Sequence, residues 1–223
     1  MSTGRPLQLA VLISGRGSNM AAIARACAAG EIDARVRLVI SERAGVAGLD
    51  TARALGLETR TIAWSGATER LRFERALERA LADARADLIV LAGFMRILSQ
   101  EFVEARIGRI LNIHPSLLPL YRGLHTHRRV LAAGERVHGA SVHFVTAELD
   151  GGPVILQSRV AVLPDDTEAA LSARVQATEH IIYPRVIGWL ADGRLAWRGE
   201  RPWLDGKPLA VPLVEDFDVS RES

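Results

Sequence analysis

An amide and an imidazole stand two residues apart at the end of an apolar run. Residues 110–114 read Ile-Leu-Asn-Ile-His, and Pro115 follows, which blocks further ladder pairing. Side chains two apart on a strand share a face, so Asn112 and His114 should lie side by side. An amide can hold a developing oxyanion, and an imidazole can move a proton near neutral pH. The pattern predicts a catalytic pair at the carboxyl end of a strand, and a strand that simply stops at a proline is the alternative.

A glycine-rich turn follows the first apolar run of the chain. Residues 14–19 read Ser-Gly-Arg-Gly-Ser-Asn. Glycines let the backbone approach an anion, and the start of a helix presents unpaired N–H groups with a partial positive charge. The turn therefore predicts a phosphate site, with a plain strand-to-helix turn capped by Ser18 as the alternative. It matches neither the dinucleotide fingerprint, whose third glycine is replaced by Met20, nor a P-loop, which needs a lysine.

Two further segments carry candidate binding residues. Asp150 stands beside two glycines in the loop 146–153, where an aspartate usually caps its own backbone. Residues 93–98 follow another apolar strand and read Gly-Phe-Met-Arg-Ile-Leu, which suits either the core or a pocket for a flat, largely apolar ligand. His125 and His127 are two apart and would not converge on a metal ion from a helix, so we expect no metal site.

The elements that must hold these residues alternate between strands and helices. We expect strands at residues 9–14, 36–40, 59–63, 88–92, 110–113, 142–145 and 154–162, and helices at 18–29, 49–55, 68–84, 100–107 and 167–190, the last interrupted near Pro184. This order predicts an α/β fold with a doubly wound, mostly parallel, Rossmann-like sheet. Residues 1–223 should form a single domain with an irregular tail from about Gly199 and frayed last residues.

Composition excludes several other classes of protein. With 223 residues and 48% hydrophobic content the chain can bury one core, and it has no apolar run long enough to cross a membrane. Its first eight residues lack the apolar core of a secretory signal, so we expect a cytoplasmic protein. The net charge is +2, and the 28 basic residues, of which only Lys207 is a lysine, are spread out, so no nucleic-acid partner is expected. Cys27 is the only cysteine and should be a small helix residue, not a nucleophile.

Taken in order, these segments resemble one family, the phosphoribosylglycinamide formyltransferases, which are folate-dependent enzymes of purine biosynthesis. The resemblance runs from about Leu9 to Gly206. Its most specific parts are residues 14–19, 91–98 (Leu-Ala-Gly-Phe-Met-Arg-Ile-Leu), 112–119 (Asn-Ile-His-Pro-Ser-Leu-Leu-Pro), 123–127 (Gly-Leu-His-Thr-His) and 148–155 (Glu-Leu-Asp-Gly-Gly-Pro-Val-Ile). The wider superfamily shares Asn112, His114 and Asp150, so these three fix only the reaction type.

The resemblance implies a role for each segment. The formyl group of the cosubstrate 10-formyltetrahydrofolate would pass, without a metal, to the amine of 5'-phosphoribosylglycinamide through a tetrahedral intermediate. Asn112 and His114 would stabilise that intermediate, and Asp150 would keep His114 protonated. The phosphate and ribose would contact Gly17, Ser18, Asn19, Met20, Ala21, Gln176, Ala177, Thr178 and Glu179. The folate would contact Arg70, Met95, Arg96, Ile97, Leu98, Asn112, Thr146, Ala147, Glu148, Leu149 and Asp150, although a solvated helix arginine is an equally good interpretation of Arg70.

One position departs from the family pattern. Arg122 stands where the family usually has proline, and Arg-Gly is commoner in the methionyl-tRNA formyltransferase branch, which carries a further C-terminal domain. The formyltetrahydrofolate hydrolase branch lacks the Gly-Ser-Asn turn and normally adds an N-terminal regulatory domain. Formyl transfer between small molecules is therefore the favoured function, hydrolysis is the second, and a non-catalytic folate- or nucleotide-binding protein is the third. No face of the chain is obviously reserved for self-association.

Overall fold

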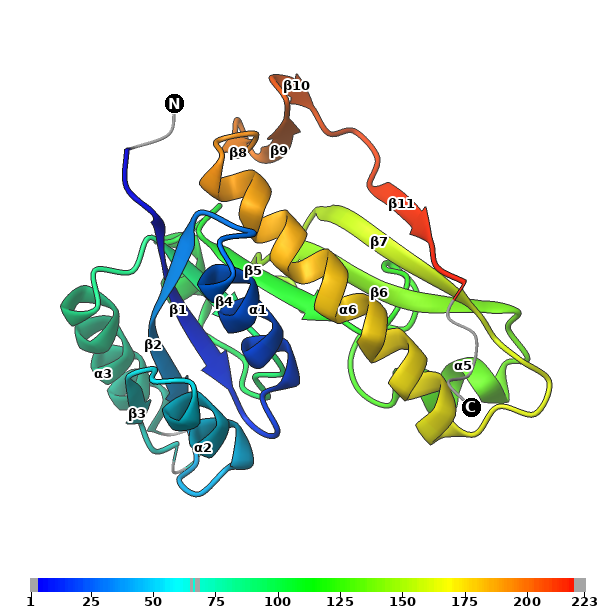
Figure 1. Cartoon of the computed structure of the whole chain (residues 1–223), viewed down its shortest axis with the longest axis horizontal. Coiled ribbons are helices and arrows are strands. Elements are labelled where there is room, and N and C mark those ends of the chain that lie inside the picture. Colours follow the sequence, from blue (N-terminus) through cyan, green and yellow to red (C-terminus); the bar gives the residue numbers. More distant parts are fainter. Residues whose placement is uncertain (1–3, 65, 67–68, 219–223) are drawn as a thin grey trace.

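An eight-stranded sheet forms the centre of the computed structural model, which describes residues 4–64, 66 and 69–218 (Figure 1). The strand order is β11-β7-β6-β5-β4-β1-β2-β3. The strands are β1 (Leu7–Ile13), β2 (Ala34–Ser41), β3 (Thr59–Thr61), β4 (Leu88–Leu91), β5 (Ile110–His114), β6 (Val137–Phe144), β7 (Val154–Ala161) and β11 (Leu213–Asp216). Among these strands only β6 runs antiparallel to its neighbours, so the predicted mostly parallel α/β sheet is confirmed.

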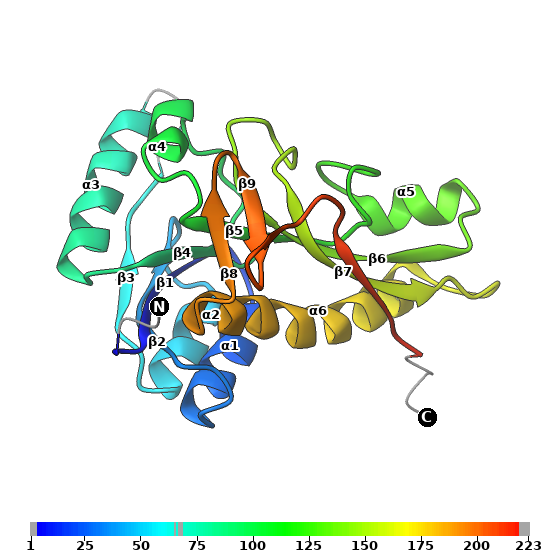
Figure 2. The ribbon, with the colours of Figure 1, turned by 90° about the horizontal axis from the view of Figure 1, so that it is seen from above.

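Helices cover both faces of this sheet (Figure 2). α1 (Ser18–Ala28), α2 (Ala47–Ala54) and α6 (Glu168–Ala191) lie on one face, and α3 (Arg70–Asp83) and α4 (Gln100–Glu104) lie on the other. The apolar run of β1 serves both cores, because Leu9, Val11 and Ile13 pack with α1 and α6, whereas Ala10 and Leu12 pack with α3 and α4. A strand buried on both faces reads as a continuous apolar run, and this is how it was recognised in the sequence.

Before the tail, three elements differ most from the sequence-based expectation. β6 begins at Val137, before the expected residue 142; its first half includes His138 and Gly139, which are buried but do not read as an apolar run. α5 (Thr126–Ala132) is a short helix that was not expected. α6 runs unbroken through Pro184, so the expected interruption was wrong. The neighbouring Ile182 and Val186 are fully buried, and their packing compensates for the backbone donor that proline lacks.

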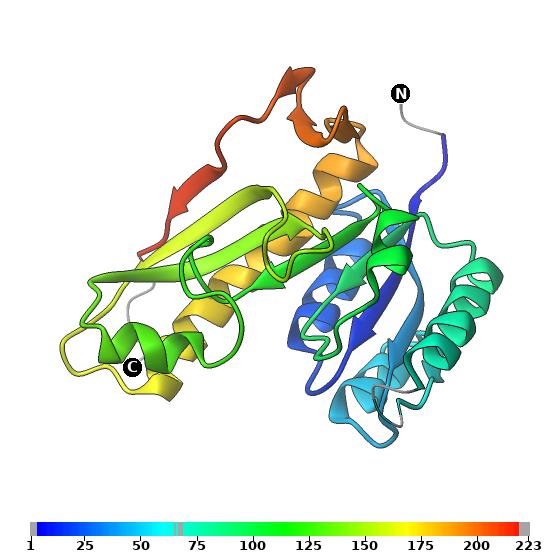
Figure 3. The same ribbon diagram turned by 180° about the vertical axis from the view of Figure 1, so that it is seen from behind.

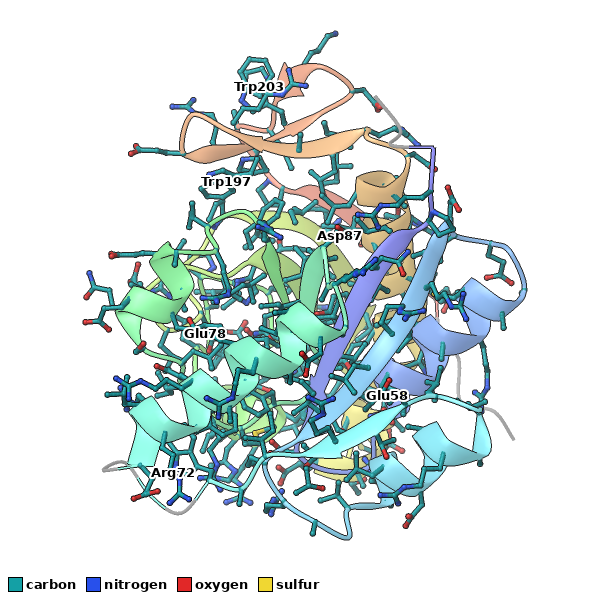
Figure 4. All side chains as sticks on the ribbon, turned by 90° about the vertical axis from the view of Figure 1, so that its left-hand side faces the viewer. Glu58, Arg72, Glu78, Asp87, Trp197 and Trp203 are labelled. Atoms are coloured by element: carbon teal, nitrogen blue, oxygen red, sulfur yellow. The ribbon has the colours of Figure 1, made fainter. Side chains whose placement is uncertain are left out.

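The tail is ordered, and the expectation of an irregular segment from Gly199 was wrong. β8 (Leu195–Arg198), β9 (Arg201–Leu204) and β10 (Lys207–Pro208) form a small antiparallel sheet. The chain then crosses to the edge of the main sheet, where β11 pairs in parallel with β7 (Figure 3). Trp197 fastens the small sheet to the main body, with its ring centroid 5.2 Å from that of Phe144, and Trp203 lies further out (Figure 4). The expected fraying concerns last residues that lie mostly outside the described ranges.

Most other boundaries agree with the sequence to within a few residues. The expected helix start at Thr68 lies outside the described residues, and α3 begins at Arg70. α4 ends at Glu104 instead of at residue 107. Cys27 is half-buried on α1, and burial raises the pKa of its thiol to about 11, which suits a helix residue and not a nucleophile. None of the helices in the described ranges combines the length and apolar character that a membrane span requires.

Candidate active site

The structure brings Asn112, His114 and Asp150 together at the carboxyl end of β5. Asn112 and His114 lie on the strand itself, and Asp150 lies in the loop after β6 with a positive φ of 49°. Nδ1 of His114 lies 3.5 Å from Oδ2 of Asp150, and both side chains are buried. The backbone N–H of Gly123 donates to the same carboxylate oxygen at 2.9 Å. The carboxylate is thus fixed between the imidazole and a second loop.

Both ring nitrogens of His114 face hydrogen-bond acceptors. Nε2 lies 3.0 Å from the carbonyl oxygen of Tyr121, and Nδ1 faces the Asp150 carboxylate. A carbonyl oxygen and an ionised carboxylate can only accept, so the doubly protonated ring satisfies both contacts. The arrangement can therefore supply a cationic imidazole next to the amide of Asn112.

The glycine-rich turn is held against α2 without any intervening side chain. Gly17 caps α1 in the left-handed conformation, with φ 72°. A Cβ at this position would lie 2.9 Å from Cα of Gly48, and a Cβ at Gly48 would lie 2.7 Å from the carbonyl oxygen of Gly15. The two backbones touch directly, so the start of α1 has little freedom and its N–H groups are fixed before any anion arrives.

A cavity of about 370 Å³ opens beside this turn. It is lined by Gly17, Ser18 and Asn19 from the turn, by Arg16 and Arg43, and by residues of α6 on the opposite side, namely Ser172, Gln176 and Glu179. Burial raises the pKa of Glu179 to about 7, although Asn19 donates to its Oε2 at 2.7 Å, which acts in the opposite direction. The cavity thus offers N–H donors and guanidinium groups at one end and a carboxyl group at the other.

Four of the residues expected around this cavity do not line it. Met20 and Ala21 belong to α1, and their side chains are buried in the core. Thr178 is fully buried, and its hydroxyl pairs with Ser158 at 2.7 Å. Ala177 is exposed on the outer side of α6. Each of them neighbours a lining residue in the sequence, but helical geometry turns its side chain away from the cavity.

A second, smaller cavity of about 110 Å³ lies beside Asn112 and Asp150. It is also lined by Arg96, Ile97, Leu98, Thr146, Ala147, Glu148 and Leu149, all expected as folate contacts. Met95 instead lines the first cavity. Arg70 lines neither cavity and lies in a separate groove between α3 and α4. Both cavities reach the ends of β4 and β5, because neighbouring residues line them: Ala92, Gly93 and Ile113 line the first, and Leu91, Phe94 and Asn112 line the second.

A buried carboxylate between the two cavities was not expected from the sequence. Ser14 donates to Oε2 of Glu42 at 2.9 Å and accepts from the backbone N–H of Met95 at 2.8 Å. The other oxygen of Glu42 lies 3.5 Å from Nε of Arg43 and 3.4 Å from Nε of Arg96. These two arginines line the first and second cavity, respectively. Glu42 follows the second strand directly, and this position at a carboxyl strand end is the signal that could have found it.

Arg122 contacts the loop that carries Asp150. Its guanidinium forms an ion pair with Glu148, a contact that proline at this position could not make. Arg129 in turn donates to the carbonyl oxygen of Arg122 at 2.7 Å. The departure from the family pattern therefore ties the segment before α5 to the loop 146–150.

Histidine side chains are common metal ligands, and several lie near the site. Over residues 4–64, 66 and 69–218, no three His, Cys, Asp or Glu side chains gather in a way that could hold a metal ion. His125 is the N-cap residue of α5. Nδ1 of His127 lies 3.0 Å from Nε2 of His138, a buried histidine of β6.

The doubly wound sheet, with an amide, an imidazole and a carboxylate at the carboxyl end of β5 and two cavities nearby, defines the class of protein. The chain belongs to the formyl transferase family, which matches residues 7–187. It is an enzyme of the formyltransferase class.

Within this class, the resemblance seen in the sequence is confirmed. Phosphoribosylglycinamide formyltransferase of Escherichia coli (strain K12) is 52% identical over 203 residues, which cover 91% of this chain and 96% of that protein. The enzyme of the same name from Haemophilus influenzae is 42% identical, over 91% of this chain and 95% of that one. The solved structure of a phosphoribosylglycinamide formyltransferase from Coxiella burnetii matches with a TM-score of 0.87 and 47% identity, over 94% of this chain and all of that one.

Proposed function

We propose that this enzyme transfers the formyl group of 10-formyltetrahydrofolate to the amine of 5'-phosphoribosylglycinamide, in the cytoplasm, as a step of de novo purine (IMP) biosynthesis. The observation that carries the proposal is that both cavities reach the carboxyl ends of β4 and β5, where Asn112 lines the smaller one. One cavity has the anion-binding features that a ribonucleotide phosphate needs, and the other is partly apolar and opens at the Asp150 loop. The partners are then two small molecules, with no metal, nucleic acid or membrane involved.

The reaction places specific demands on Asn112 and His114. The substrate amine attacks the formyl carbon, a C–N bond forms, and the electron pair of the C=O bond moves to the oxygen. Asn112 donates an N–H to that oxyanion, and His114 in its protonated form stabilises it or gives a proton to the departing folate nitrogen. Asp150 balances the imidazolium charge. The attacking nitrogen becomes an ammonium and loses one proton, which His114 takes up after giving its own to the folate nitrogen. The C=O bond re-forms, and the bond between the formyl carbon and the folate nitrogen breaks, as the intermediate collapses.

The substrate contacts follow the two cavities. The phosphate would bind at Gly17, Ser18 and Asn19, where Met20 and Ala21 open the helix, and the ribose hydroxyls would donate to Glu179 within the segment 176–179. The folate would bind along Met95 to Leu98 and the loop Thr146 to Asp150. Arg70 stays a prediction whose position in a separate groove gives it no support from the geometry.

One experiment distinguishes transfer from the two alternatives. Purified protein receives 10-formyltetrahydrofolate with and without 5'-phosphoribosylglycinamide, while tetrahydrofolate formation is followed by absorbance and the formylated product by mass spectrometry. We expect formyl loss only when the amine is present. Formyl loss without the amine would indicate a hydrolase, and no turnover in either case would indicate a binding protein.

A further inference from the structure

His143 is a buried histidine outside the predicted catalytic trio. It lies on β6 directly across from Asn112 of β5, and only 2% of its surface is exposed. Its Nδ1 lies 2.9 Å from the carbonyl oxygen of Phe144, and its Nε2 lies 3.1 Å from Nδ2 of Asn112. Both ring nitrogens have partners, and the chemistry of these partners decides which nitrogen carries the proton.

A carbonyl oxygen can only accept a hydrogen bond, so Nδ1 of His143 is the nitrogen that donates. Burial lowers the pKa of His143 to about 4, so the ring is neutral near pH 7 and carries a single N–H. Nε2 therefore holds a lone pair, and the Asn112 amide donates to it. The nearer oxygen of Asp150 lies 4.0 Å from Nε2, beyond hydrogen-bond distance, and an ionised carboxylate has no proton to offer it.

This contact fixes the orientation of the Asn112 amide. If the amide turned over, its oxygen would face the lone pair of Nε2, and repulsion would replace a hydrogen bond. In the observed orientation one N–H is donated to His143, and the second remains available to a ligand in the cavity that both residues line. The terminal torsion of an asparagine side chain is otherwise broadly distributed. The hydrogen bond to His143 restricts this torsion and keeps the N–H of Asn112 in one direction, as an oxyanion donor requires.

We propose that His143 is a positioning residue for formyl transfer, which holds the Asn112 amide with its free N–H toward the reacting carbonyl oxygen. The role rests on the function proposed above, in which Asn112 donates to the oxyanion. In this role His143 acts through the orientation of the Asn112 amide, to which its Nε2 is bonded. Loss of one oxyanion donor lowers kcat about 10²- to 10³-fold, so misorientation of that donor should cost about 10- to 10²-fold.

Steady-state kinetics of His143→Phe and His143→Gln test the proposal. Phenylalanine keeps a ring in the buried space but removes the acceptor, whereas the amide oxygen of glutamine can replace the Nε2 acceptor. We expect His143→Phe to lower kcat about 10- to 10²-fold with little change in the KM of either substrate. His143→Gln should recover at least half of that loss on a logarithmic scale. A loss confined to KM, or no recovery with glutamine, would overturn the proposal.

A double-mutant cycle with Asn112→Ala separates positioning from a purely structural role. In the Asn112→Ala background, His143→Phe should lower kcat by less than about twofold, because its partner is already gone. His138→Phe is the matched control, since His138 lies on the same strand, is 1% exposed, also has its pKa lowered to about 4 by burial, and contacts His127 instead of Asn112. Its effect should multiply with that of Asn112→Ala. The same multiplication for His143→Phe would contradict the positioning role.

The tautomer can be measured on the wild-type enzyme, so the test survives a variant that does not fold. Long-range ¹H–¹⁵N correlation spectra of the histidine side chains should place the proton of His143 on Nδ1, and a proton on Nε2 would overturn the proposal. Wild-type turnover with both substrates is measured first. Its absence rejects the proposed function, whereas turnover combined with an independent His143 effect rejects only the positioning role.

Discussion

The carboxyl group of Glu179 should make the stability of this enzyme fall as the pH rises. Burial raises its pKa from the ordinary value of 4.5 to about 7. Below pH 4.5 the group is neutral in both the folded and the unfolded chain. Between pH 4.5 and 7 the unfolded chain ionises first, and the stability that the raised pKa contributes is lost until the folded chain has ionised as well. At about 1.4 kcal/mol per pKa unit, the total loss is about 3 kcal/mol.

Glu179→Gln removes this ionisation and leaves a similar shape. Urea titrations of both proteins at several pH values give the difference in unfolding free energy, in which the other titrating groups largely cancel. About 2.5 kcal/mol of the expected loss of stability occurs between pH 5 and pH 8. The unfolding free energy of the variant should therefore rise by this amount relative to that of wild type over this range. Its KM for the ribonucleotide should rise nevertheless, because the carboxyl group is a proposed acceptor for ribose hydroxyls.

Glu74→Gln is the matched control, because this buried carboxylate accepts hydrogen bonds from the backbone N–H and the hydroxyl of Ser99 at 2.6 and 2.7 Å. Its replacement should destabilise the protein by about 1 to 3 kcal/mol, since a paired acceptor is lost. The difference in unfolding free energy between wild type and Glu179→Gln could instead stay constant within about 0.5 kcal/mol from pH 5 to pH 8. In that case burial would not raise the pKa of Glu179, and the reasoning would fail.

Three further outcomes are expected. Asn112→Ala and His114→Ala should each lower kcat about 10²- to 10³-fold at an unchanged urea midpoint, and near-normal turnover in either variant would show that the residue is structural. Gly17→Val should raise the KM for the ribonucleotide far more than that for the folate, because its Cβ would lie 2.9 Å from Cα of Gly48 at the phosphate turn, and equal effects on both substrates would contradict the assignment. Arg122→Ala and Glu148→Gln should show a coupling in unfolding free energy of at most about 1 kcal/mol, lost at high salt, because the two side chains are 38% and 64% exposed; a larger, salt-independent coupling would refute a simple surface ion pair.

The sequence predicts the elements whose side chains share one character. The apolar strands β1, β4 and β5 and the glycine turn were found because burial on both faces and a positive φ leave clear residue patterns. The first half of β6 lay outside the expected bounds 142–145, because His138 and Gly139 interrupt its apolar character although the fold buries both. Their hydrogen-bond partners lie on other segments, so hydropathy could not reveal the strand.

The candidate site was predicted at the level of motifs but not of side-chain directions. Asn112, His114 and Asp150 converge as expected, since strand alternation and the family resemblance both place them at one sheet end. The expected set on α6 was a continuous run, from which the structure selects Gln176 and Glu179 because a helix turns the other two residues away. Glu42 was missed although its place at a carboxyl strand end could have indicated it, whereas the role of His143 depends on a contact with Asn112, which is distant in the sequence.

The last strand also limits how the main sheet can grow. Its two edge strands are short, with three residues in β3 and four in β11. The eight-residue strand β7 is the neighbour of β11 in the sheet. A long strand with uncovered N–H and C=O groups can pair with a strand of another chain. A chain that ends after Leu209 would present the Leu156–Arg159 segment of β7 in this way. The cost of losing the tail should therefore be concentration-dependent association of otherwise active molecules, visible by light scattering before any change in turnover.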